Sequence, residues 1–180
     1  MSKETAIVIA PGRGVYGQSE LGYLQKWHSQ KQHFLRGIDT YRIEHDRPAI
    51  TLLDSAAKYA SSRHATSKNA SALIYACALA DFSDIALDRF DIVAVTGNSL
   101  GWYLALAAAG ALSPEAAMTL IDTMGHLMED HGVGGQLVYP LVDSEWRTSP
   151  ERAQAVEQAI RSAAGLKGSA VYHSIHLGGM

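Results

Sequence analysis

The stretch that decides the fold is residues 92–109, which read IVAVTGNSLGWYLALAAA. Its first part, Ile92–Thr96, is a short run of β-branched and small apolar residues, the pattern of a buried strand. From Leu100 to Ala109 the stretch is rich in alanine and leucine, which favour a helix. Gly97–Gly101 spans the junction between the two, so we expect a buried strand to turn sharply into a helix there.

This junction contains a G-x-S-x-G motif formed by Gly97, Ser99 and Gly101. The spacing alone arises by chance in roughly one such chain in ten, but its place between strand and helix is more informative. A tight turn would hold the Ser99 hydroxyl away from the backbone, and the glycines would let strand and helix approach closely. We interpret Ser99 as a candidate nucleophile and the Leu100 N–H as an oxyanion donor. The alternative is an ordinary turn whose serine caps the helix.

Outward from this junction, apolar runs and capping signals predict alternating strands and helices. A strand over Thr5–Ala10 runs into the glycine-rich segment PGRGVYG at 11–17, and residues 30–48 are interpreted as a loop or short helix. Further strands are predicted over Gln136–Val142 and Ser169–Leu177. Helices are predicted from about Ser19 and over Ala49–Ala60 and Ala70–Ala80, and also from the Ser-Pro pairs Ser113-Pro114 (to about Asp130) and Ser149-Pro150 (to about Gly165).

These elements predict an α/β chain with a large part, 1–133, and a small part, 134–180. The large part is expected to hold a parallel sheet flanked by helices, with Ser99 at the tip of a strand. The small part is expected to be a β-α-β unit, which by itself would expose an apolar sheet face and unpaired edges. We therefore expect a further segment, or a second polypeptide, to complete the fold.

Composition excludes several classes of function. Of 180 residues, 47% are hydrophobic and 18% are charged, and the formal net charge is −3 without a large block of one sign. This charge distribution contains no large basic segment that would attract a nucleic acid or an anionic membrane surface. The single cysteine, Cys77, cannot form an internal disulfide, which suits a cytoplasmic location. The longest apolar stretch, Leu100–Leu112, is too short to span a bilayer, and no signal-peptide pattern is visible.

The sequence also resembles a known family. Residues 97–113, GNSLGWYLALAAAGALS, resemble the G-H-S-L-G-E-Y-x-A-L-x-A-A-G-x-L stretch of acyl-carrier-protein S-malonyltransferases and polyketide synthase acyltransferase domains. Ala116–Met128 is similar to the A-x-x-L-x-x-x-R-G-x-x-M helix of that family, and Ala10–Gly14 resembles its F-P-G-Q-G-S-Q loop. Residues 174–179 stand at the place of its N-x-N-S-P turn. These motifs occur in the same order as in the family, over nearly the whole length of the chain.

The resemblance implies a hydrolase-like large part, followed by the first half of a ferredoxin-like subdomain. It also implies a ping-pong acyl transfer in fatty-acid or polyketide biosynthesis. Ser99 would take the acyl group from acyl-CoA and pass it to the phosphopantetheine thiol of an acyl carrier protein. The coenzyme A thioester and phosphopantetheine are substrates, and no bound cofactor is implied. Oxyanion donors would be the N–H groups of Leu100 and Arg13, and the pocket would include Gly12, Gly14, Asn98, Trp102, Met124 and His176.

Three departures from the family pattern indicate a divergent and truncated member. The catalytic histidine of the family falls after the last residue here, so a further segment or a partner chain would have to supply it. Met124 stands where an arginine grips the malonyl carboxylate; a methionine cannot neutralise that charge, which favours an uncharged acyl group. Asn98 and Trp102 replace the histidine and glutamate that surround the family's serine.

The sequence leaves alternative interpretations open. An acyl hydrolase of the same fold would share Ser99, and a degenerate binding domain would not need the histidine. Residues 12–17 also spell G-x-G-x-x-G, a dinucleotide-binding fingerprint, but Asp39 lacks the preceding apolar run that would make it the ribose ligand. The spacings of His126 with His131 and of His173 with His176 do not place either pair on one face, so no metal site is expected.

Overall fold

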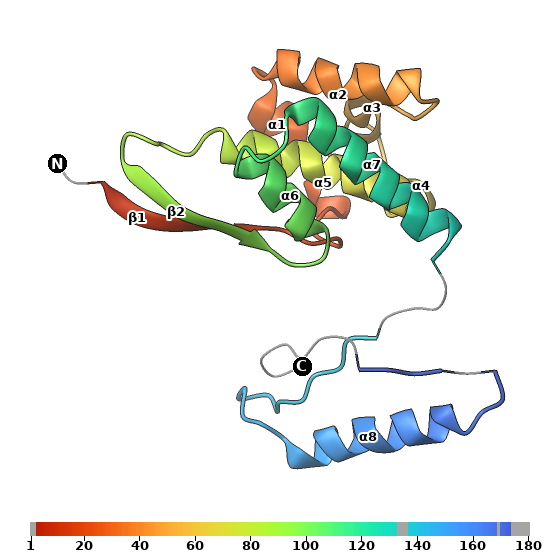
Figure 1. The fold of residues 1–180 in the computed structure, drawn as a ribbon. Coiled ribbons are helices and arrows are strands. Elements are labelled where there is room, and N and C mark those ends of the chain that lie inside the picture. Colours follow the sequence, from red (N-terminus) through yellow and green to blue (C-terminus); the bar gives the residue numbers. More distant parts are fainter. Residues whose placement is uncertain (1–2, 133–136, 169, 174–180) are drawn as a thin grey trace. The chain divides into compact units, whose positions relative to one another are not determined.

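The computed structural model describes residues 3–132, 137–168 and 170–173. The chain divides into two compact units, Met1–Gly132 and Val133–Met180. Figure 1 shows the first unit as a small sheet with a group of helices against it, and the second as a single long helix with irregular segments.

The sheet of the first unit consists of two parallel strands, β1 (Glu4–Ala10) and β2 (Phe90–Gly97). The positions of both strands predicted in this part of the chain are confirmed, but the expectation that they are buried was wrong, because Ile7, Ile9 and Val93 are exposed. Their register runs from Glu4 opposite Phe90 to Ala10 opposite Gly97, with one irregularity between Ala6 and Ile7. Because the carboxyl ends of parallel strands share one edge, the segments that follow Ala10 and Gly97 emerge side by side. This pairing brings the glycine-rich loop to the serine motif.

The chain between the two strands is helical, as a parallel connection requires. Its central helix is α5, which packs against α7, α6, α3 and α1. Most of α5 is buried, including Ala72, Leu73 and Ala76, so this helix lacks a polar face. Ser113 caps α7 by accepting from the Ala116 N–H, as its Ser-Pro signal predicted. The helices of the first unit are η1 (Gln18–Glu20), α1 (Tyr23–His28), α2 (Gln32–Glu44), α3 (Ile50–Asp54), α4 (Ser61–His64), α5 (Ser67–Phe82), α6 (Leu100–Ala108) and α7 (Pro114–Asp130).

The structure decides one open alternative for this unit, that of residues 30–48, and shows that the expected helix over Ala49–Ala60 was wrong. Residues 30–48 contain the 13-residue helix α2. Its pattern was hard to recognise because one of its three buried positions is an arginine, Arg42, beside Leu35 and Ile38. The helix expected over Ala49–Ala60 is shorter than predicted. The helix there, α3, ends at Asp54, and the next helix, α4, begins at Ser61.

Arg42 is fully buried and joins three helices. Its guanidinium donates to the carbonyl oxygens of Pro48 and Lys68, to Asn69 Oδ1 at 2.7 Å and to Asp122 Oδ1 at 3.4 Å. Burial lowers the pKa of Arg42, and the Asp122 carboxylate on α7 opposes this shift. A buried charge with this many acceptors is tolerated, whereas loss of one partner would leave it uncompensated. The network therefore holds α2, α5 and α7 in one arrangement.

The second unit contains one described helix, α8 (Pro150–Ala164), capped by Ser149, which accepts from the Arg152 N–H as predicted. The strand expected over Gln136–Val142 is not formed in its described part, where an isolated bridge joins Val142 to Thr148. Residues 170–173 are not in a strand either, and the rest of the predicted strand 169–177 lies outside the described residues. β-branched residues form a strand only where another strand pairs with them. The β-α-β half of a ferredoxin-like subdomain is therefore not observed in the described part.

Within residues 3–132, 137–168 and 170–173, no helix combines the length and apolar character needed to cross a bilayer.

A pair of leucines on α6 tests the packing of this helix. Leu104 is completely buried, whereas Leu106 on the same helix is 43% exposed. We expect Leu104→Ala to lower the free energy of unfolding by about 3 kcal/mol, because it removes buried methyl groups and leaves a cavity. Leu106→Ala should cost less than about 1 kcal/mol. Urea denaturation measures both, and equal losses would contradict the burial of Leu104 against the core.

Candidate active site

The turn between β2 and α6 holds Ser99 in an unusual backbone conformation. Its φ is 55° and its ψ is −121°, a combination that a residue with a side chain rarely adopts. Its side chain is exposed and makes no capping hydrogen bond to α6. Ser99 is therefore not an ordinary capping serine in this structure. The turn presents its hydroxyl outward at the N-terminus of the helix, and such strain is a reason to consider a functional role.

The two glycines of the motif allow a close approach that no other residue would permit. A Cβ atom on Gly97 would lie 2.3 Å from the carbonyl oxygen of Gly101, and one on Gly101 would lie 2.4 Å from that of Ala10. Real Cβ atoms do not come this close to other atoms. The end of β1, the turn and the first residues of α6 are therefore in direct backbone contact, as the motif predicted.

The glycine-rich segment Pro11–Gly17 lies against the serine turn. A Cβ atom on Gly12 would be 3.1 Å from the Asn98 carbonyl oxygen and 3.8 Å from Ser99 Cβ. Gly14 has a φ of 99°, which favours glycine. Leu100, as the first residue of α6, has no acceptor for its N–H within the helix. The segments that carry the two expected oxyanion donors, Arg13 and Leu100, thus meet at Ser99.

The dinucleotide alternative does not suit this loop. A phosphate site of that kind needs a helix N-terminus directly after the glycines. The chain instead enters the three-residue turn η1, and the Gly17 N–H donates to the Glu20 carboxylate at 2.8 Å. A phosphate placed there would face this carboxylate and compete with it for the same N–H.

The far end of the loop is fixed in the core. Tyr16 is 5% exposed and donates to Asp54 Oδ1 at 2.7 Å. Burial, followed by the Asp54 hydrogen bond and charge, raises the pKa of Tyr16 well above its ordinary range. Asp54 also accepts from the Gln25 N–H at 3.3 Å, which ties the loop to α1 and α3. Sequence reasoning missed this anchor because a tyrosine inside a glycine-rich segment carries no sign of its distant partner.

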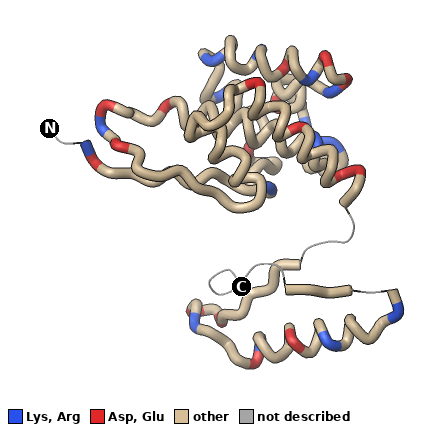
Figure 2. Tube along the Cα trace, viewed as in Figure 1, with Lys and Arg blue, Asp and Glu red and all other residues tan. Residues whose placement is uncertain are grey.

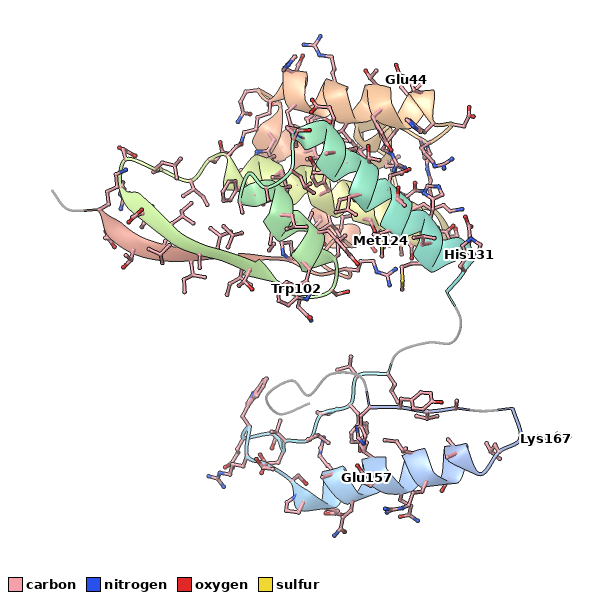
Figure 3. The ribbon with its side chains drawn as sticks, viewed as in Figure 1. Glu44, Trp102, Met124, His131, Glu157 and Lys167 are labelled. Carbon is pink, nitrogen blue, oxygen red and sulfur yellow. The ribbon has the colours of Figure 1, made fainter. Side chains whose placement is uncertain are left out.

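The other expected pocket residues are less closely grouped. Asn98 and Trp102 are exposed beside Ser99, and Met124 is half-buried on α7. In the view of Figure 3, Trp102 and Met124 lie on the same side of the first unit, where α6 begins. His176 lies outside the described residues.

Two neighbouring cavities open near Pro11, and neither is lined by Ser99. One, of about 170 Å³, has polar groups on its wall from Tyr16, Glu20, Tyr23 and Asp81. The other, of about 250 Å³, is lined by the end of β1 and by apolar residues of α5 and α6. Both are separate from the exposed face on which the serine stands, and sequence reasoning did not foresee them.

No general base for Ser99 is found in the described part of the chain. None of the histidines described there hydrogen-bonds to Ser99; the most buried, His64, contacts the carbonyl oxygens of Ala60 and Leu53. His28 is buried against Asp81, with Nε2 to Oδ1 at 2.7 Å, in an ion cluster that links α1 to α5. Across the described ranges, no group of three or more histidine, cysteine or acidic side chains could hold a metal ion. The thiol of Cys77 has its pKa raised by burial, which keeps it protonated and unreactive.

The fold and the turn define an α/β protein with a small parallel sheet, flanking helices and a sharp strand-to-helix turn at its serine motif. No protein-family model matches the chain, and no curated protein matches it significantly. Among solved structures, it is similar to an acyl-carrier-protein S-malonyltransferase from Burkholderia pseudomallei 1710b, with a TM-score of 0.63 and 19% sequence identity. The match covers 89% of this chain and 49% of that one, so this chain spans about half the length of its structural relative. This likeness shows the fold.

The close approach at the turn can be tested with two helical glycines. We expect Gly101→Ala to lower the free energy of unfolding by about 2 kcal/mol or more, because the new methyl group would overlap the Ala10 carbonyl oxygen. Gly37→Ala on α2 is the matched control, since a Cβ there meets nothing within 4 Å. It should stabilise the chain by about 0.5 to 1 kcal/mol. A tolerated Gly101→Ala change would show that β1 and α6 leave room for a side chain between them.

The anchor at Tyr16 predicts a dependence on pH. Because the folded-state pKa of Tyr16 is raised above its ordinary value of 10.0, its contribution to stability is complete below about pH 10 and is lost above it, where the unfolded chain ionises. Between about pH 10 and 11, the free energy of unfolding should fall faster in the wild type than in Tyr16→Phe, by up to about 1.4 kcal/mol per pH unit. Denaturation curves across this range measure the difference; parallel pH profiles would contradict the proposed anchor.

Proposed function

We propose that this chain belongs to an acyltransferase that moves an acyl group from a coenzyme A thioester to the thiol of an acyl carrier protein. The observation that carries the proposal is Ser99, exposed on a strained turn with the Pro11–Gly17 loop packed against it. The likeness to an acyl-carrier-protein S-malonyltransferase supports the same reaction class.

The chemistry has two steps. In the first, Ser99 Oγ bonds to the thioester carbonyl carbon, and the carbon–sulfur bond breaks. The hydroxyl proton passes through a base to the departing thiolate, which leaves as a thiol. In the second step, the carrier sulfur bonds to the acyl carbon, the ester bond to Ser99 Oγ breaks, and the proton of the carrier thiol passes through the base to Ser99. Negative charge on the carbonyl oxygen would be stabilised by the N–H groups of Leu100 and Arg13, aided by the N-terminus of α6.

The base would come from outside the described residues. Serine at neutral pH is a weak nucleophile without one. We propose that a histidine in a further segment, or in a partner chain, takes this part.

The residues expected to line the pocket favour a neutral acyl group. Trp102 is 59% exposed beside the serine, and Met124 offers a half-buried thioether. Neither side chain can neutralise a carboxylate, so we propose that the acyl group is not malonyl in particular. In Figure 2, basic and acidic residues are interspersed in each unit rather than gathered into one patch of a single sign. Over the described residues, such a surface lacks the clustered basic residues that nucleic-acid binding requires.

Because Ser99 is exposed, hydrolysis of the acyl-serine is the second candidate function. Water can reach an acyl-serine that stands in the open, so the same site could release free acid. Loading of a carrier protein and release of free acid, measured side by side on the protein with its base present, separate the two functions.

Labelling with a fluorophosphonate tests the nucleophile directly. Ser99 Oγ would bond to phosphorus as the phosphorus–fluorine bond breaks, and the proton would leave with fluoride. On the protein with its base present, we expect one adduct by intact mass, located on Ser99 by peptide mapping. Ser99→Ala should abolish it, a loss of at least about 100-fold. Ser62→Ala, at another exposed serine, should label as the wild type does. An adduct that survives Ser99→Ala, or a wild type that does not react, would refute the acyl-enzyme mechanism.

A further inference from the structure

Packing holds the Pro11–Gly17 loop in place at both ends, whereas the backbone around Arg13, in the middle of the loop, is not held in this way. At one end, Gly101 packs against the carbonyl oxygens of Ala10 and Pro11; at the other, Tyr16 is held in the core. Arg13 lies between them with a glycine on each side. A Cβ atom on Gly14 would meet nothing within 4 Å, so this part of the loop lies in open space. Gly14, directly after Arg13, has more backbone freedom than a residue with a side chain would have.

The side chain of Arg13 compensates for this freedom. Its Nη1 donates a hydrogen bond to Ser67 Oγ, although the two residues lie 54 positions apart. Among the described residues Arg13 forms no ion pair with a carboxylate, so a neutral hydroxyl holds the guanidinium.

The other end of this contact is rigid. Ser67 is the first residue of α5, the most buried helix of the unit. Its carbonyl oxygen lies 2.9 Å from the place that a Cβ on Gly125 of α7 would take, so the two helices are in close contact there. A hydrogen bond to this hydroxyl therefore ties the middle of the loop to the helical core.

We propose that the Arg13 side chain is a positioning residue, which tethers the loop to Ser67 and thereby aims the Arg13 N–H at the oxyanion formed on Ser99. This inference rests on the proposed acyl-enzyme mechanism. An N–H contributes to an oxyanion hole only when it is held in place before the reaction. Removal of one donor typically costs about 100- to 1,000-fold in rate, so loosening one should cost about tenfold.

The test compares Arg13→Gln, Ser67→Ala and the double variant, each in the protein with its base present. Two fluorophosphonate probes are used, one with a neutral tail and one with a carboxylate tail of equal length. We expect each single variant to react with both probes about tenfold more slowly than the wild type. The double variant should be no slower than either single variant, because both changes break one contact.

Three controls separate positioning from general structural damage. Ser67→Thr keeps a hydroxyl and should retain most of the rate. Arg36→Gln removes an exposed arginine of α2 and should leave the rate unchanged. Melting temperatures of all variants should stay within about 2 °C of the wild type, since the contact is exposed. Amide hydrogen exchange in the loop should become faster in Arg13→Gln and in Ser67→Ala.

Distinct outcomes overturn distinct claims. Wild-type rates and wild-type hydrogen exchange in both single variants would overturn the tether while leaving the acyl-enzyme proposal intact. A loss confined to the carboxylate probe in Arg13→Gln, with no effect of Ser67→Ala, would show that the guanidinium binds substrate and would also overturn the tether. A wild-type chain that neither probe labels would overturn the proposed function, and the tether would fall with it.

Discussion

The structure of the candidate site depends on one close contact, that of the Gly101 backbone with the carbonyl oxygens of Ala10 and Pro11. This contact joins the end of β1 to the start of α6 without an intervening side chain. Two residues earlier, Ser99 adopts a left-handed φ, a strained conformation that persists only where the surrounding structure holds it. Its exposed side chain stands at the N-terminus of α6.

The helices support this contact from a distance. α5 is buried on most of its surface, and α6 and α7 pack against it. Arg42 adds a polar constraint by joining α2, α5 and α7 through four acceptors. Apolar packing alone tolerates small rotations of helices, whereas a buried guanidinium loses free energy when any acceptor moves away. A strained turn persists only when the structure around it is rigid, and these packed helices provide that rigidity.

In the proposed mechanism, the backbone N–H groups of Leu100 and Arg13 would stabilise negative charge, whereas no described side chain is placed to move a proton. The two segments that carry these N–H groups meet at Ser99. The described histidines serve other purposes: His28 pairs with acidic residues, and His64 contacts backbone carbonyls. In the proposed mechanism, electrostatic stabilisation would therefore come from the arrangement of β1, β2 and α6, and general base catalysis from residues outside the described ones.

By itself, the sequence determined the two strands, the serine turn and the capped starts of α7 and α8. These features are local, because β-branched runs, G-x-S-x-G spacing and Ser-Pro pairs act within a few residues. The tertiary structure alone decided that α2 is a helix with a buried arginine, that α3 ends at Asp54, and that residues 137–142 form no strand. It also decided that Arg13 reaches Ser67 and Tyr16 reaches Asp54. Such contacts join residues tens of positions apart, and the free energy that selects them comes from burial and pairing that no local pattern records.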